Sequence, residues 1–124
     1  MNKYYIRIDN LKFQIFPRDT YTAQKIIINL PLRGECQRWG KEYYFDTKLL
    51  GIPLEYTAKQ IINFGEIAYW PSGHAIAIGY GKTPISTGDE IKLADKCNIW
   101  ADTKFDLNKL ENLANPKDIA VFSK

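Results

Sequence analysis

The chain has 124 residues, of which 45% are hydrophobic and 25% are charged. This length suits one domain, and the composition is that of a folded globular protein rather than a disordered chain. The formal net charge is +3, and no two Lys or Arg residues are adjacent. The sequence therefore lacks the basic arm that tracks phosphates, and we expect no nucleic-acid partner.

Membrane and metal chemistry find little support in the residues. No run of about 18 apolar residues occurs, so we expect no membrane partner. The N-terminal residues lack the apolar core of a signal peptide, which favours a cytoplasmic location. Cys36 and Cys97 are the only cysteines and His74 is the only histidine, which excludes a zinc site with four Cys and His ligands. We expect two unpaired thiols, no bound metal and no cofactor.

Two segments near the N-terminus, 3–9 and 11–16, alternate apolar and polar residues. Asp9-Asn10 stands between them, and both residue types tolerate tight turns. The pattern predicts a β-hairpin. A helix is expected next over about 20–30, capped by Asp19 or Thr20 and stopped by Pro31. Its apolar stripe consists of Ala23, Ile26, Ile27 and Leu30.

A second hairpin is predicted from 32–39 and 42–47, around Gly40-Lys41. Its second strand is rich in aromatic residues, as strands prefer. Residues 48–65 show no clear period. Gly51-Ile52-Pro53 indicates a turn there, and a short extended or helical piece follows.

The central part of the chain predicts two further strands, 66–70 and 74–80, joined by Pro71-Ser72-Gly73. Alternation in the first strand places Ile67 and Tyr69 on one face and Trp70 on the other. We expect a long loop over 81–96 and a seventh strand over 97–101.

The C-terminal part predicts a second helix that begins after Asp106, with Leu107, Leu110 and Leu113 as its buried stripe. Asn115-Pro116 ends it, and the last strand is 119–123. Eight short strands without β-α-β alternation favour an all-β fold. We predict a closed eight-stranded antiparallel barrel, one domain over 1–124, with the two helices at its open ends.

Three segments carry a resemblance to known proteins. Residues 65–75 (GEIAYWPSGHA), 81–86 (GKTPIS) and 38–45 (RWGKEYYF) are similar to motifs of a small prokaryotic branch of the cyclophilin-like superfamily. The resemblance covers essentially the whole chain. It implies a closed eight-stranded barrel capped by two helices, as the pattern of elements also predicts.

The resemblance implies a fold more than an activity. Prolyl-isomerase cyclophilins carry a Phe-His-Arg segment whose arginine polarises the proline amide, and this chain has no such segment. His74 lies between Gly73 and Ala75 with no arginine near it in the sequence. We therefore predict no catalytic residues.

Gly81-Lys82-Thr83 invites comparison with a phosphate-binding loop. A Walker A motif needs an earlier glycine where this chain has Ile76, and it needs a helix after Lys-Thr, where this chain has Pro84. The segment is interpreted as a structural turn.

The aromatic residues supply the best candidate site. Trp70 and His74 flank the Pro71-Ser72-Gly73 turn, and the neighbouring hairpin brings Arg38 and Trp39. Together they make an amphipathic platform for a ligand. The predicted ligand-binding residues are Arg38, Trp39, Trp70, His74 and Tyr80. The alternative is that these aromatic side chains only fill the core.

The leading functional hypothesis is a non-catalytic module that binds a peptide or a small organic molecule. The alternatives are an atypical prolyl isomerase and an accessory subunit of an amide-hydrolysing assembly, the latter with a protein partner. Both rest on fold analogy. An arginine converging with an aromatic pocket would favour the isomerase, and a flat exposed apolar patch would favour the subunit.

Overall fold

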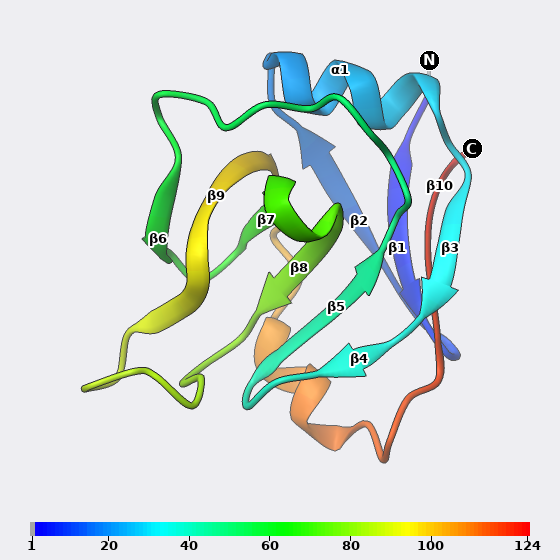
Figure 1. The fold of residues 1–124 in the computed structure, drawn as a ribbon. Coiled ribbons are helices and arrows are strands. Elements are labelled where there is room, and N and C mark those ends of the chain that lie inside the picture. The colour runs from blue at the N-terminus through cyan, green and yellow to red at the C-terminus, as the bar shows by residue number, and fades with distance from the viewer. Residues whose placement is uncertain (1) are drawn as a thin grey trace.

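The computed structural model describes residues 2–124, which form a nearly closed antiparallel β-barrel (Figure 1). Ten strands, one α-helix and two short 3₁₀-helices make up these residues. In chain order they are β1 (Tyr4–Ile8), β2 (Leu11–Pro17), α1 (Tyr21–Ile28), β3 (Leu32–Glu35), β4 (Gln37–Arg38), β5 (Glu42–Asp46), β6 (Lys59–Ile62), β7 (Glu66–Trp70), η1 (Pro71–Gly73), β8 (Ala75–Gly79), β9 (Ile91–Asp102), η2 (Leu107–Asn112) and β10 (Asp118–Ser123).

The strands follow the order β3-β10-β1-β2-β9-β7-β8-β5-β4, and β6 pairs with β9 outside this path. The barrel closes where β3 approaches β5. A Cβ atom at Gly34 of β3 would stand 2.9 Å from Cδ2 of Phe45 and 3.4 Å from the Asp46 carbonyl oxygen. The absence of a side chain at Gly34 therefore lets the two edges come together.

The main hydrophobic core fills the barrel, because alternate side chains of each strand point inward. Trp100, Tyr69 and Ile76 are completely buried there. Figure 1 shows α1 at one end of the barrel and η2, drawn in orange, at the other. The helical residues that enter the same core are Ala23, Ile26, Leu107 and Leu110. The two predicted capping helices are thus confirmed in position.

A second, smaller apolar layer lies on the outside of the barrel. We call the paired segments 59–62 and 91–97 the β6–β9 ribbon. Its side chains pack on small residues of β7 and β8, and a Cβ atom at Gly79 would stand only 2.5 Å from Cγ2 of Ile91. The buried members of this layer are Ile62, Ala68, Ala77, Ile91, Leu93, Cys97 and Ile99. The ribbon therefore covers one patch of the outer sheet surface.

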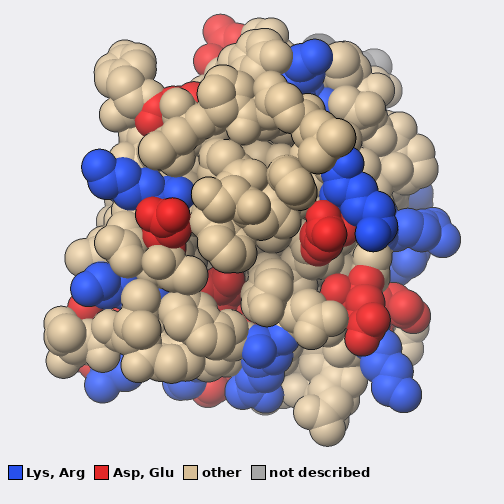
Figure 2. Space-filling view, in the orientation of Figure 1, with Lys and Arg blue, Asp and Glu red and all other residues tan. Residues whose placement is uncertain are grey.

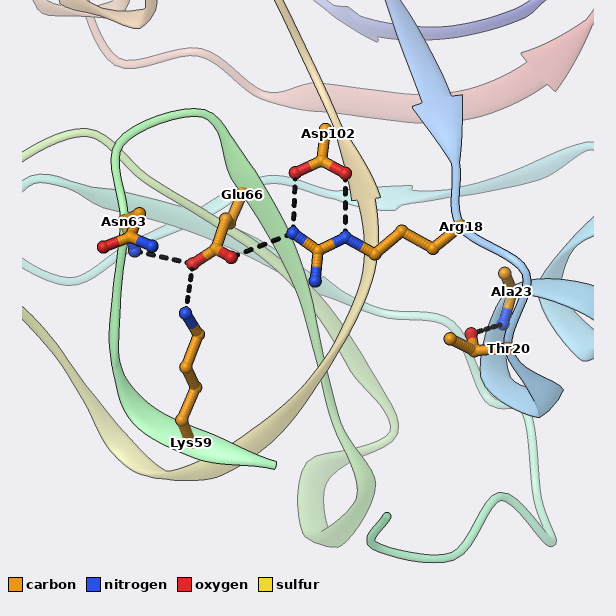
Figure 3. Close-up of polar contacts among 7 residues, drawn as sticks. All are labelled: Arg18, Thr20, Ala23, Lys59, Asn63, Glu66 and Asp102. Atoms are coloured by element: carbon orange, nitrogen blue, oxygen red, sulfur yellow. Dashed lines mark hydrogen bonds and ion pairs between the residues drawn. The ribbon is translucent and has the colours of Figure 1, made fainter. Parts of the chain in front are cut away.

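A charge network ties the ribbon to the barrel (Figure 3). The guanidinium of Arg18 donates two hydrogen bonds of 2.8 Å to Asp102 and one of 2.9 Å to Oε2 of Glu66. Oε1 of Glu66 accepts from the Lys59 ammonium and from the Asn63 backbone N–H, both at 2.7 Å. Both carboxylate oxygens of Glu66 are thus paired. Burial alone would raise the pKa of Glu66, but these donors outweigh it and hold the pKa below its ordinary value.

Most predicted strands are confirmed, and the all-β barrel is the observed fold. The helix predicted over 20–30 is α1, and Thr20 rather than Asp19 is its cap, because its side chain accepts from the Ala23 N–H at 3.1 Å. The strand predicted over 32–39 is divided at Cys36. The Cys36 N–H still bonds to the Lys117 carbonyl, after which the chain leaves β10 and pairs with β5.

Other predictions were wrong in type or extent. The segment after Asp106 is the 3₁₀-helix η2, and the turn at 71–73 is the 3₁₀-helix η1. The short extended or helical piece expected within 48–65 is the strand β6, whereas the loop predicted over 81–96 contains the first half of β9. Ten strands are observed where eight were predicted, because β6 was not counted as a strand and the strand expected over 32–39 is divided into β3 and β4. The pairing of β6 with β9 is irregular, with a register shift between Lys59 and Ile61.

Cys36 and Cys97 are both free, as expected. No helix among residues 2–124 is long and apolar enough to cross a membrane. Within the same residues, no group of three or more His, Cys, Asp or Glu side chains is arranged to hold a metal ion.

A candidate ligand pocket between the barrel and the ribbon

A pocket of about 250 Å³ opens between the outer face of the barrel and the β6–β9 ribbon. Figure 2 shows the face of the molecule on which β5, β8 and this ribbon lie, with uncharged side chains over its centre and acidic and basic ones on either side. The pocket is lined by Trp39, Glu42, Tyr44, Trp70, Ala75, Ala77, Leu93, Ala94 and Cys97.

The alternation of β5 and β8 creates the pocket. On β5, Tyr43 and Phe45 point into the barrel, which leaves Glu42 and Tyr44 on the outer face. On β8, the large residues point inward and the small residues Ala75 and Ala77 point outward. Because Tyr44 stands opposite Ala77, the missing side-chain volume on β8 becomes open space beside β5.

Glu42 is the one formally charged residue that lines this pocket, and it is 7% exposed. Its Oε1 is buried and has no hydrogen-bond partner among residues 2–124. The adjacent Lys41 is occupied with Glu111, 2.9 Å away. Burial raises the pKa of Glu42 to about 7, because no cation offsets the cost of removing a carboxylate from water.

Trp70 forms a second wall and is folded back over its own turn. A Cβ atom at Gly73 would stand 2.4 Å from Cε3 of the indole, so only glycine leaves room for the ring there. The indole Nε1 is buried, and no acceptor among the described residues reaches it. The Trp-Pro-x-Gly segment therefore places an aromatic wall with an unused donor beside the pocket.

The loop 81–86 holds Trp39, another wall of the pocket, in place. Gly40 has a φ of +61°, and a Cβ atom there would stand 2.8 Å from Cδ of Pro84 and 2.9 Å from the Lys82 carbonyl oxygen. The Lys41 N–H donates to that same oxygen at 2.9 Å, and the Thr83 hydroxyl donates to the Lys92 carbonyl of β9. The loop thus fastens the turn that carries Trp39 to β9. Its contacts are those of a structural turn.

Two of the five predicted ligand-binding residues, Trp39 and Trp70, meet in this pocket. Arg38 is exposed; its Nε donates to the Gly40 carbonyl at 3.1 Å, and its guanidinium lies 5.9 Å from the centre of the Tyr43 ring. Tyr80 lies in the core, where its ring stacks on Tyr43 at 5.4 Å.

His74 also lies apart from the pocket lining. It adopts the left-handed conformation, with a φ of 51°, directly after η1. Its carbonyl oxygen accepts from the backbone N–H and the hydroxyl of Thr47, at 2.8 and 2.6 Å. Its backbone thereby joins the end of η1 to the end of β5.

Sequence reasoning missed Glu42, Tyr44 and the ribbon residues that line the pocket. One signal for Glu42 was present. In the strand 42–47, alternation places Glu42 on the face opposite Tyr43 and Phe45, beside Trp39. The small residues at every second position of β8 were a further signal for a covered or hollow outer face.

Known proteins place this chain in a family. A family model described as Cyclophilin-like matches residues 2–121. The chain belongs to the cyclophilin-like family. The resemblance drawn from the three motifs is thereby confirmed, and all three motifs contribute to the pocket or to its support.

A solved structure supports the same assignment. The cyclophilin-like chain is similar to the hypothetical protein AF2241 from Archaeoglobus fulgidus, whose solution structure matches with a TM-score of 0.78 and 29% sequence identity. The match covers 98% of this chain and 93% of that one. Among curated proteins none matches. The comparisons thus establish the family and the fold.

Proposed function

We propose that this cyclophilin-like chain binds a small organic molecule or a peptide side chain in the pocket formed by Trp39, Glu42 and Trp70. The observation that carries the proposal is that two residues of the pocket lining each hold a buried polar atom without a partner, Oε1 of Glu42 and Nε1 of Trp70. Three core atoms, the hydroxyl oxygens of Tyr43 and Tyr80 and Nε1 of Trp100, also lack a partner among the described residues. Buried polar atoms in folded proteins are almost always hydrogen-bonded. A ligand in the pocket would supply the missing partners.

The dimensions of the pocket support a ligand of side-chain size. At about 250 Å³ it falls just below the usual range for drug-sized molecules. Aromatic rings and aliphatic side chains form most of its lining, with one carboxyl group among them. This is the usual composition of a binding site, in which apolar walls give affinity and a few polar groups give orientation.

The lining residues favour binding without chemistry. Burial raises the pKa of the Cys97 thiol to about 12, so it is not a thiolate nucleophile at neutral pH. The lining contains no arginine, and Arg38 bonds to its own turn instead. The feature that would favour an atypical prolyl isomerase therefore gives that alternative no support. A cytoplasmic setting forms part of the proposal, and the two free thiols are consistent with it.

The test is a fragment screen by thermal shift, followed by chemical-shift mapping of the hits. We expect stabilising fragments to shift the indole N–H signals of Trp39 and Trp70 while leaving that of the core residue Trp100 in place. Trp70→Ala should weaken binding by about 2 kcal/mol, as loss of a packed aromatic anchor does. The matched control is Tyr56→Ala, because Tyr56 is fully exposed and lies outside the pocket lining.

Stability measured on the same variants separates binding from packing. If Trp70→Ala lowers the free energy of unfolding and leaves the affinity of the fragments unchanged, Trp70 is a packing residue only. Hits that map consistently to another surface, or a screen without hits, would contradict the proposal.

A further inference from the structure

We propose that the ligand of this pocket carries a primary ammonium group, which pairs with Glu42 while its carbon framework lies against Trp39, Tyr44 and Trp70. This inference rests on the proposed function, since it names the chemical class of the ligand for the same pocket. The ammonium can be that of a free amine or of a lysine side chain in a peptide.

The first argument is the charge of the pocket. Glu42 is buried, its Oε1 is unpaired, and it is the only formally charged side chain in the lining. A carboxylate in such a place is stabilised by a cation that also donates hydrogen bonds. A neutral ligand would leave the charge uncompensated, and an anionic ligand would be repelled by it.

The second argument comes from the chain itself. Glu66 is buried to the same extent as Glu42, with 7% of each residue exposed. At Glu66 the missing charge is supplied internally, and the Lys59 ammonium stands 2.7 Å from Oε1. The pocket has a comparable carboxyl group but no lysine among its lining residues. A ligand ammonium would fill the place that Lys59 fills at Glu66.

The third argument is the nature of the walls. Trp39, Tyr44 and Trp70 line the same pocket as the carboxyl group. The faces of indole and phenol rings attract organic cations, and tryptophan does so most strongly. A primary ammonium is favoured over a quaternary one, because only the former has N–H groups for Oε1. An oxygen atom elsewhere on the ligand could accept from the Trp70 indole N–H.

Proton release from Glu42 should accompany ligand binding. An ammonium favours the charged form of Glu42, so affinity should increase as the pH rises through about 7. The other titratable side chains facing the pocket are Tyr44 from β5 and Cys97 from β9, while β7 and β8 contribute only Trp70 and alanines. Burial raises the pKa of Cys97 to about 12, so its titration lies far from this range.

The experiment compares benzylammonium with benzyl alcohol, which has similar shape and no charge, by NMR titration of the full chain. We expect benzylammonium to bind about tenfold or more tightly and to shift the Trp39 and Trp70 indole signals. Glu42→Gln, which keeps the shape and removes the charge, should abolish this preference. The control Glu35→Gln removes a carboxylate from an exposed site on β3 and should preserve it.

A titration with N-acetyl-lysine N-methylamide distinguishes the two sources of the ammonium. Tighter binding of this compound than of benzylammonium would point to a peptide, and the reverse order to a free amine. Equal binding of benzylammonium and benzyl alcohol at the pocket would overturn the ammonium inference and leave the proposed function standing. No binding of either cation at the pocket would also overturn it, whereas the proposed function fails only if the fragment screen finds no ligand there.

Discussion

Glu42 and Glu66 each stand at the start of a strand on the same barrel, and each is 7% exposed. Around Glu66 the chain has gathered a guanidinium, an ammonium and a backbone N–H. Around Glu42 it has gathered aromatic rings and alanines, and one carboxylate oxygen remains unpaired. Equal solvent exposure of the two residues therefore coexists with opposite pKa shifts. The difference shows that partners, not burial alone, distinguish a structural carboxylate from one available to a ligand.

The first of two comparably large effects comes from removing the charge of Glu66, the paired carboxylate. Glu66→Gln should lower the free energy of unfolding by about 3 kcal/mol at neutral pH, because Arg18 and Lys59 lose their shared charged partner. Because the pKa of Glu66 is lowered on folding, this contribution is present above the ordinary value of 4.5 and is lost at more acidic pH. Urea unfolding at pH 7 and at acidic pH measures it. A loss below about 1 kcal/mol at pH 7 would contradict the structural role.

The second prediction concerns Glu42, the unpaired carboxylate, through which stability should change with pH in the opposite direction. The pKa of Glu42 is about 7 in the folded chain against an ordinary 4.5, so stability should fall by about 3 kcal/mol as the pH rises between these values. Glu42→Gln should remove this slope and make the variant more stable than wild type at pH 8. Urea unfolding at a series of pH values from about 4 to about 8, a range that spans both pKa values of Glu42, measures this change. A Glu42→Gln variant with the wild-type slope would show that another group titrates.

A smaller effect is expected from Gly73→Ala, which disturbs the pocket without touching the Glu66 network. The added methyl group would overlap the Trp70 ring and should destabilise the chain by about 2 kcal/mol. A displaced Trp70 would admit water, so the pKa of Glu42 should move down toward 4.5. Carbon-13 NMR titration of the Glu42 carboxyl group reports this directly. An unchanged Glu42 titration would mean that Trp70 does not shield it.

The smallest effect serves as a reference without charge. Thr20→Ala removes the side-chain acceptor for the Ala23 N–H at the start of α1 (Figure 3) and should cost about 1 kcal/mol. No titratable group takes part in this bond. The loss should therefore be the same at about pH 4 and about pH 8, which lie on either side of the Glu42 titration. Urea unfolding at both values provides the check. A loss that varied with pH would show that such slopes have sources other than the two glutamates.

The sequence by itself determined most of the barrel. Alternation is a local property, so it located β1 and β2 and assigned Trp70 of β7 to the outer face. The apolar run after Pro71-Ser72-Gly73 located β8. Three motifs indicated the family. These inferences succeeded because each depends on residues that are neighbours along the chain.

Tertiary structure alone decided which glutamate is paired. Glu66 receives Arg18 from the end of β2 and Lys59 from β6, whereas Glu42 is covered by a ribbon whose strands the sequence pattern did not reveal. Whether a buried carboxylate meets a cation or an open pocket depends on contacts between segments far apart in the chain. Alternation specifies the face on which a side chain lies, and the packing of distant segments specifies what it meets there.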